Sequence, residues 1–350
     1  MNATGSQPSI EASAERLFEA EARARPPVSF IAWSKVSERS TEIAEALGGE
    51  SKCFYDFRFV DPERTPLRYA VSAVQTVLYL LTRRPRAVIA SNPPVIPGLI
   101  AYLYGRLTGA PIVLDSHPAA FGFYESKKFI KLLMPLHHFL IPRVQGSIVS
   151  VEDLVERVQQ REGRAAIVHE APSLWASSPP PSLQGRPTVL LVCNFNVDEP
   201  VELVFEAAQQ LPDVDIVVTG DLRKCPPQLL EHPASNLRFV GFLDQSAYRD
   251  ALVDANVVMT LTNRPEAVNR VANEAVFARR PLIVSDWPAL ERYFPYAVRV
   301  SNSIDGVVAG VSEALQRHDQ LRLQVDQALE VQEERWNAQL RDLRELVGLS

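Results

Sequence analysis

Short apolar runs alternate with amphipathic helical patterns along most of the chain. In the first half the apolar runs predict strands at 28–33, 53–59, 87–91, 111–115 and 146–150. Helical periodicity lies between them, at 40–47, 67–81 and 97–107. Because this alternation is typical of parallel α/β architecture, the sequence predicts doubly wound parallel sheets.

A proline-rich stretch interrupts this alternation at 172–187 (PSLWASSPPPSLQGRP), and we interpret it as a semi-rigid linker. Strands are then predicted at 189–192, 215–219, 237–240, 257–261, 282–285 and 298–300, followed by a long charged helical region over 304–347. The predicted organisation is a tail (1–25), a first Rossmann-like domain (26–171), the linker, and a second Rossmann-like domain with C-terminal helices (188–350). Ligands of such sheets bind beyond the carboxyl ends of the strands, which predicts a site in a cleft between the domains.

Composition excludes several classes of function. The formal net charge of −6 argues against nucleic acid as a partner, since phosphate backbones require a basic surface. Cys53, Cys193 and Cys225 form no CxxC pair, which argues against a disulfide framework and a zinc site. No apolar run approaches the roughly 20 residues that cross a bilayer, and no secretory signal opens the chain. We therefore expect a cytoplasmic protein, either in the cytosol or peripheral on the inner face of the cell membrane. We also expect no cofactor.

The segment 262–294 carries the most specific pattern. A loop with Glu266 follows a strand, a Glu274-Ala275 step lies in a helix beginning near Val268, and Arg280-Pro281 leads into the next strand. This order resembles the nucleotide-sugar site of retaining B-type glycosyltransferases, especially glycosyltransferase family 4. The resemblance implies the GT-B fold, a ribose-binding role for Glu274 and a catalytic contact of Glu266 with the donor sugar. The alternative is that both are solvated helix carboxylates.

The same resemblance extends the donor site to neighbouring turns and basic residues. It implies that Gly220, Asp221 and Gly241 lie at strand-end turns near the nucleotide, although ordinary turns would explain them as well. The loop and helix start add Arg264, Asn269 and Arg270 as further contacts. Backbone N–H groups at a helix N-terminus suit an anionic diphosphate.

The first predicted domain offers a second group of candidates. His117 follows the strand at 111–115, where a side chain points toward a ligand, and in the family a residue here touches the donor sugar. We expect His117 to be catalytic, with a structural histidine as the alternative. Lys35 and Arg39 follow the first strand and are candidates for phosphate or acceptor contacts. Simple surface basicity is the other interpretation.

One departure from the family pattern concerns the diphosphate. Family members usually present an arginine and, five residues later, a lysine after the first strand of the second domain, whereas this chain has Asn194 and Glu199. A glutamate repels phosphate. Either Arg264, Arg270 or Arg39 supplies the charge, or the chain is an inactive subunit that binds a partner glycosyltransferase or a glycan.

The predicted function is a metal-independent transfer of a sugar from a UDP- or GDP-sugar to a saccharide or lipid-linked acceptor, in cell-surface glycan or polysaccharide biosynthesis. The family resemblance implies that this transfer retains the anomeric configuration. The basic and apolar segment 127–143 is a candidate for contact with a membrane surface, as in monotopic enzymes, with a solvent-facing helix as the alternative. A nucleotide-sugar epimerase on the same fold is the rival enzyme. No lysine is placed to hold pyridoxal phosphate, which disfavours a phosphorylase.

Overall fold

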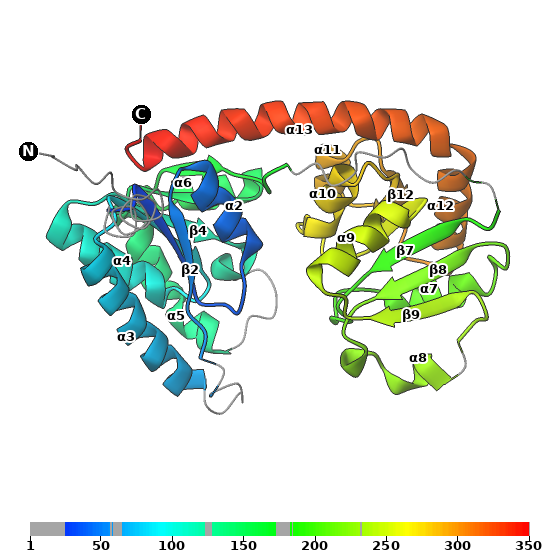
Figure 1. Ribbon diagram of the computed structural model, residues 1–350, viewed down its shortest axis with the longest axis horizontal. Coiled ribbons are helices and arrows are strands. Elements are labelled where there is room, and N and C mark those ends of the chain that lie inside the picture. The colour runs from blue at the N-terminus through cyan, green and yellow to red at the C-terminus, as the bar shows by residue number, and fades with distance from the viewer. Residues whose placement is uncertain are drawn as a thin grey trace, which may run out of the picture. The chain divides into compact units, whose positions relative to one another are not determined.

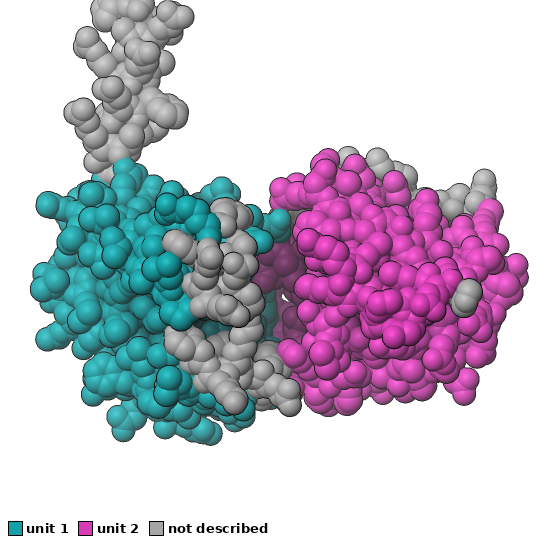
Figure 2. All heavy atoms as spheres, turned by 90° about the horizontal axis from the view of Figure 1, so that it is seen from below, with its two compact units in different colours: residues 1–169, 338–350 teal, residues 170–337 magenta. Residues whose placement is uncertain are grey.

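The computed structural model describes residues 25–56, 58, 65–122, 128–172, 183, 185–231 and 233–349, without the side chains of 128–130. Nearly all of the predicted tail and most of the predicted linker lie outside these residues. The chain divides into two compact units, Met1–His169 with Ala338–Ser350 (unit 1) and Glu170–Asn337 (unit 2), coloured separately in Figure 2. Each unit contains one parallel sheet flanked by helices (Figure 1).

Unit 1 is built on a six-stranded parallel sheet with the order β2-β1-β3-β4-β5-β6. Its strands are β1 (Val28–Ala32), β2 (Glu50–Cys53), β3 (Ala87–Asn92), β4 (Ile112–Ser116), β5 (Gly146–Val149) and β6 (Ala165–Ile167). Its helices are α2 (Glu38–Ala46), α3 (Thr65–Arg83), α4 (Ile96–Thr108), α5 (Lys128–Leu140) and α6 (Glu152–Gln159), with short 3-10 helices η3 (Pro118–Phe121) and η4 (Ile141–Arg143). The strand order reverses at β1, so ligands are expected beyond the carboxyl ends of β1 and β3.

Local sequence explains where these elements begin and end. β1 is buried along its whole length, as expected for a central strand covered on both faces. The side chain of Ser37 accepts a hydrogen bond from the Ser40 amide and so caps α2. Gly109, with a left-handed φ of 78°, ends α4.

The second strand differs from its prediction. The apolar run 53–59 predicted a strand there, whereas β2 is the polar stretch Glu50–Cys53 at the edge of the sheet. Pairing with β1 sets this position, since Ala32 lies opposite Cys53 and the Phe54 amide then bonds to the Ala32 carbonyl (2.9 Å). Because an edge strand needs no buried side chains, a run of apolar residues does not mark its position in the sequence.

Unit 2 contains a second six-stranded parallel sheet, with the order β12-β11-β10-β7-β8-β9. Its strands are β7 (Thr188–Val192), β8 (Asp215–Thr219), β9 (Leu237–Gly241), β10 (Val257–Thr260), β11 (Leu282–Ser285) and β12 (Val298–Val300). Its helices are α7 (Val201–Ala208), α8 (Pro227–Glu231), α9 (Gln245–Asp254), α10 (Arg270–Phe277), α11 (Pro288–Tyr293) and α12 (Ile304–Gln316), with the 3-10 helix η5 (Leu222–Lys224). The predicted strands of this half agree with these bounds to within one residue. The hydrophobic core of unit 2 consists of apolar side chains from its strands, packed against apolar side chains of α7 and α12.

The final helix, α13 (His318–Leu346), contributes to both units. The sequence predicted that 188–350 forms one domain, but Ala338–Ser350 group with unit 1. Leu343 and Leu346 are buried, and Leu346 lies so close to Gly146 that a Cβ there would be 3.1 Å from its methyl group. The apolar face of this last segment is therefore part of the unit 1 core.

Candidate functional site

The candidate site of unit 2 lies at the reversal point of its sheet. β7 and β10 are neighbours, and β8 and β11 continue in opposite directions from them. The loops after these two central strands are joined by two contacts: the Asn263 amide donates to the Asp198 carbonyl (2.7 Å), and the Arg264 Nε lies 3.1 Å from the Asp198 carboxylate. Such a reversal point is where open α/β sheets bind their ligands.

Glu199, which replaces the family's lysine, organises the loop after β7. One of its carboxylate oxygens accepts hydrogen bonds from the amides of Asn194 (2.9 Å) and Asn196 (2.8 Å). Burial raises the pKa of Glu199, while the two amide bonds oppose that rise. The carboxylate therefore has a local structural role that a lysine cannot fill.

Two glycines shape the neighbouring strand ends. Gly220 has a φ of +145°, and an added Cβ would lie 2.3 Å from the Cys193 carbonyl oxygen. Its amide donates to the carbonyl of Gly241, which has a φ of +72°. Beside them Asp221 forms an ion pair with Arg223 (2.7 Å), and this hydrogen bond lowers the pKa of Asp221 to about 2. The strand ends are thus held close together by backbone that only glycine adopts without strain.

A polar network around Thr262 fixes the loop after β10. The buried Thr262 donates its amide to the Ser285 hydroxyl (2.9 Å), and its carbonyl accepts from Trp287 Nε1 (2.7 Å) and Asn302 Nδ2 (2.9 Å). Its hydroxyl accepts from the Arg264 amide (3.1 Å). Sequence reasoning missed Ser285, Trp287 and Asn302, because their separation along the chain gives no signal of contact.

Helix α10 carries the buried glutamate of the predicted pair. It begins at Arg270, two residues later than expected, and Asn269 precedes it. The Asn269 side chain donates from Nδ2 to the Thr260 hydroxyl (3.1 Å). Glu274, only 4% exposed, accepts hydrogen bonds from the Tyr248 hydroxyl (2.5 Å) and Arg270 Nε (2.8 Å).

Arg270 connects two glutamates. Besides Glu274 it bonds to Glu170 through Nη1 (3.1 Å). This arrangement fixes the Glu274 carboxylate in one orientation and balances its buried charge. Glu266 lies in the preceding loop, partly exposed, and has no hydrogen-bond partner within the described part of the chain.

In unit 1, His117 and Arg39 meet at one buried carboxylate. Asp115, at the end of β4, lies 3.2 Å from His117 Nε2 and 3.1 Å from Arg39 Nη2. Burial alone would raise the pKa of Asp115, but the charges and hydrogen bonds of Arg39 and His117 hold it well below its usual range. The His117 side chain is 42% exposed, so its ring is oriented by the carboxylate and still open to solvent.

The expectation that Arg39 reaches phosphate or acceptor is corrected by this geometry. Arg39 is 8% exposed, and besides Asp115 its guanidinium bonds to the carbonyls of Val168 (2.8 Å) and His169 (3.0 Å). It is a structural cation of unit 1. Lys35 remains exposed, with its Nζ 5.5 Å from the centre of the Tyr55 ring.

The structure therefore groups the predicted residues into two sets. The donor set of unit 2 lies at the carboxyl ends of its strands and the start of α10: Gly220, Asp221, Gly241, Arg264, Glu266, Asn269, Arg270 and Glu274. His117 and Lys35 follow strands of unit 1. That the two sets face one ligand stays a prediction.

Among the described residues, no helix combines the length and apolar composition that spanning a bilayer requires. Nor do three or more His, Cys, Asp or Glu side chains gather there in a way that could hold a metal ion.

Part of this chain is similar in sequence to known sugar transferases. Residues 199–344 match the family model described as "Glycosyl transferase-like". Over 223 residues the chain is 27% identical to a phosphatidyl-myo-inositol mannosyltransferase of Mycobacterium leprae, covering 59% of this chain and 56% of that protein. The matched region therefore spans little more than half of that relative.

Solved structures give the fold. The chain superposes on sucrose-phosphate synthase from Thermosynechococcus elongatus with a TM-score of 0.74 and 14% identity, covering 92% of this chain and 98% of the other. The chain also superposes on HepE from Anabaena, solved in complex with UDP and glucose, with a TM-score of 0.68 and 11% identity. This superposition covers 92% of this chain and 99% of HepE. At this level of identity the likeness concerns the fold alone. The prediction of a GT-B fold is confirmed, as is the resemblance to B-type glycosyltransferases.

Proposed function

We propose that this chain is a hexosyltransferase that moves a sugar from a nucleotide-sugar donor to a saccharide or lipid-linked acceptor. The observation that carries the proposal is the buried Glu274 carboxylate, held by Tyr248 and Arg270 beside the reversal point of the unit 2 sheet. It lies within the segment that matches the glycosyl transferase-like model. HepE, with the same fold, was solved with UDP-glucose, which supports a nucleotide-sugar donor here.

The roles follow from the chemistry of each group. Glu274 accepts hydrogen bonds from the ribose hydroxyls, and the α10 N-terminus with Arg264 receives the diphosphate. Glu266 contacts the donor sugar. His117 touches the sugar near the reacting carbon. Catalysis then consists mainly of positioning the donor and stabilising the leaving diphosphate without a metal ion.

A membrane-bound acceptor is supported by the surface of unit 1. On α5 and just after it, Leu132 and Phe139 are exposed, and Arg143 lies over the Phe139 ring (4.0 Å). Helix α4 packs against both α3 and α5. The exposed apolar side chains of α3 and α4 are Leu67, Val74, Val77, Leu78, Leu81, Leu103 and Leu107. Apolar side chains beside basic ones suit the interface of an anionic bilayer.

Calorimetric titration of UDP and GDP against the Glu274→Gln variant tests the proposal. Loss of the charged hydrogen bonds to ribose is expected to weaken binding by about 1–3 kcal/mol. The glutamine keeps the side-chain volume of this buried position, and Glu206→Gln, exposed on α7, is the control. Wild-type affinity for both nucleotides in a folded Glu274→Gln protein contradicts the assignment.

The second candidate function is an inactive subunit that binds a partner glycosyltransferase or a glycan. It is favoured by one observation, the replacement of the family's basic pair by Asn194 and by a Glu199 that is committed to loop amides. Hydrolysis of UDP- or GDP-sugars by the purified chain separates the two. Nucleotide binding without any turnover favours the inactive subunit.

A further inference from the structure

A cavity in unit 2 lies apart from the residues assigned to the donor. It has a volume of about 370 Å³ and opens between the C-terminal end of α11 with the following loop and the middle of α13. Its lining consists of Arg292, Tyr293, Pro295, Tyr296, Gln324, Gln327, Ala328, Val331, Gln332 and Arg335. None of these residues belongs to the predicted donor set. The volume falls in the lower range of pockets that hold small molecules.

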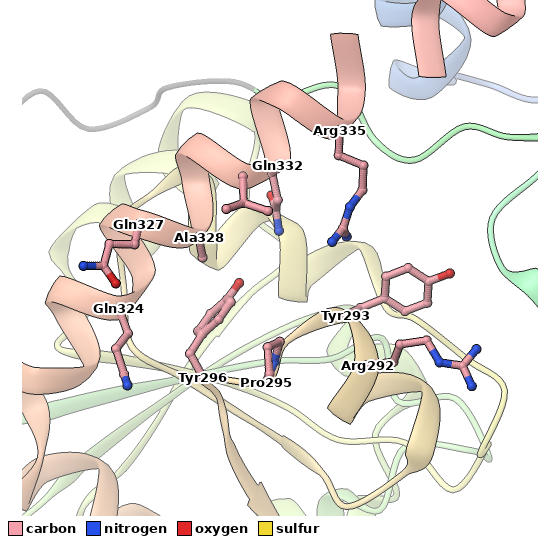
Figure 3. A pocket seen from close by; sticks show the side chains of 10 residues that line it. Arg292, Tyr293, Pro295, Tyr296, Gln324, Gln327, Ala328, Gln332 and Arg335 are labelled. Carbon is pink, nitrogen blue, oxygen red and sulfur yellow. The ribbon is translucent and has the colours of Figure 1, made fainter. Parts of the chain in front are cut away.

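Two buried polar atoms at this cavity have no partner. The Tyr296 hydroxyl and the Gln324 carbonyl oxygen are shielded from solvent, and neither makes a hydrogen bond within the described structure. Figure 3 shows Tyr296 rising from the loop with its hydroxyl directed toward α13. Leaving such groups without a hydrogen bond is unfavourable, and native proteins usually provide a partner. These atoms therefore point to a molecule that supplies hydrogen bonds inside the cavity.

One arginine of the lining, Arg335, is a candidate contact for an anion, and the lining contains no carboxylate. Arg335 has no ion pair among the described residues, and in Figure 3 its guanidinium and the amide of Gln332 point from α13 toward the loop. A guanidinium binds two oxygens of one phosphate at once, which makes it the usual choice for phosphorylated ligands.

We infer that this cavity binds a phosphorylated monosaccharide, with the phosphate on Arg335 and the sugar hydroxyls on Tyr296, Gln324 and Gln332. A phenol and amides present both donors and acceptors, as a polyol requires. Of the remaining lining residues, Pro295, Ala328 and Val331 are apolar and suit the C–H face of a sugar ring. The inference does not depend on the proposed transferase activity.

Calorimetry on the full chain tests this inference with glucose 6-phosphate and glucose 1-phosphate as probes. At least one is expected to bind with one-to-one stoichiometry, more tightly than either glucose or inorganic phosphate. Arg335→Gln is expected to weaken that binding about tenfold or more, and Tyr296→Phe several-fold. Arg341→Gln, exposed further along α13, is the matched control and keeps wild-type affinity.

The outcomes are separable from those of the nucleotide experiment. UDP affinity is expected to be unchanged in Arg335→Gln and Tyr296→Phe, which also shows that both variants are folded. The inference is overturned if neither sugar phosphate binds, or if Arg335→Gln binds it as wild type does. If inorganic phosphate binds as tightly as the sugar phosphates, the cavity does not recognise the sugar, and that part of the inference is wrong.

Discussion

At the scale of single residues, each of the two groups of candidate residues depends on a carboxylate that an arginine holds in place. Glu274 and Asp115 are both nearly fully buried, and each is bonded to an arginine of its own unit. Removing one partner of a buried ion pair leaves an uncompensated charge and costs about 3–5 kcal/mol. Arg270 and Arg39 are thus needed by these carboxylates. Arg264, Arg270 and Arg39 are the candidates for balancing the charge of the diphosphate. Because Arg270 and Arg39 are bonded to buried carboxylates, we favour Arg264.

Replacing Arg264 by alanine is expected to separate diphosphate binding from nucleoside binding. Its side chain is about one-third exposed and is paired with Asp198, so it lies at the loop surface where a phosphate can reach it. Loss of a charged contact should weaken UDP binding by about 1.5–3 kcal/mol and leave uridine almost unaffected. Titration of UDP, UMP and uridine measures this difference, with Arg317→Ala as a control of equal charge. If all three ligands bind as they do to wild type, Arg264 does not balance the diphosphate.

His117→Ala is expected to reduce turnover about 100-fold or more, the usual contribution of a positioned catalytic side chain. UDP affinity should stay within about twofold, because the histidine belongs to unit 1 and contacts the sugar in our proposal. The Asp115 carboxylate orients the ring, which predicts a smaller loss of turnover in Asp115→Asn than in His117→Ala. Steady-state kinetics and UDP titration on the same preparations measure both quantities. Equal losses of turnover and affinity would indicate general disruption, and full activity would make His117 structural.

At the scale of elements, the loops at the carboxyl ends of β7 and β8 depend on close backbone contact. Gly220 brings the end of β8 against the Cys193 carbonyl, and no other residue fits there. The contact holds the loop in which Glu199 bonds to two amides. The carboxyl ends of β7 and β8 are therefore held rigidly against each other.

Gly220→Ala is expected to destabilise unit 2 more than Gly241→Ala. Both positions have positive φ values, each costing about 1–3 kcal/mol for a residue with a Cβ. Only at Gly220 does the new Cβ also collide with backbone, whereas at Gly241 nothing lies within 4 Å. Urea unfolding of the two variants measures the difference. Equal losses of stability would mean that the loop after β7 moves aside without cost.

The elements also show what sequence can predict. Inner strands such as β7, β10 and β11 are buried on both faces, so a continuous apolar run locates them. The edge strand β6 is three partly buried residues, and the sequence prediction missed it. In the site, the loops were predicted because they follow inner strands. Side-chain contacts such as that between Tyr248 and Glu274 were not predicted. These two residues lie on different helices, and hydrophobic periodicity does not show which residues of two helices meet.

At the scale of the whole molecule, the net charge of −6 opposes association with anionic lipid, so any membrane contact must be local. The helix α5 region is the candidate, with Lys131 and Arg143 beside exposed Leu132 and Phe139. The basic residues near a charged bilayer contribute about 1 kcal/mol each, and the apolar side chains add to this on insertion.

Sedimentation with vesicles tests this contact. The chain is expected to bind vesicles that contain anionic lipid and to be released by salt. Leu132→Glu should reduce binding about tenfold or more, because it puts a charge where an exposed apolar side chain would enter the bilayer interface. Leu323→Glu, at a similarly exposed leucine of α13, is the control. Equal binding of both variants, or binding to neutral vesicles alone, contradicts a role for α5.

The sharing of α13 between the units has a consequence for how the protein is made. Unit 1 begins at the N-terminus, yet it buries Leu343 and Leu346 from the last turns of α13. A ribosome adding about 5–20 residues per second takes roughly ten to thirty seconds to synthesise the intervening segment 170–337. During that interval the nascent unit 1 lacks part of its core. Folding during translation can therefore be completed first in the unit that is synthesised second.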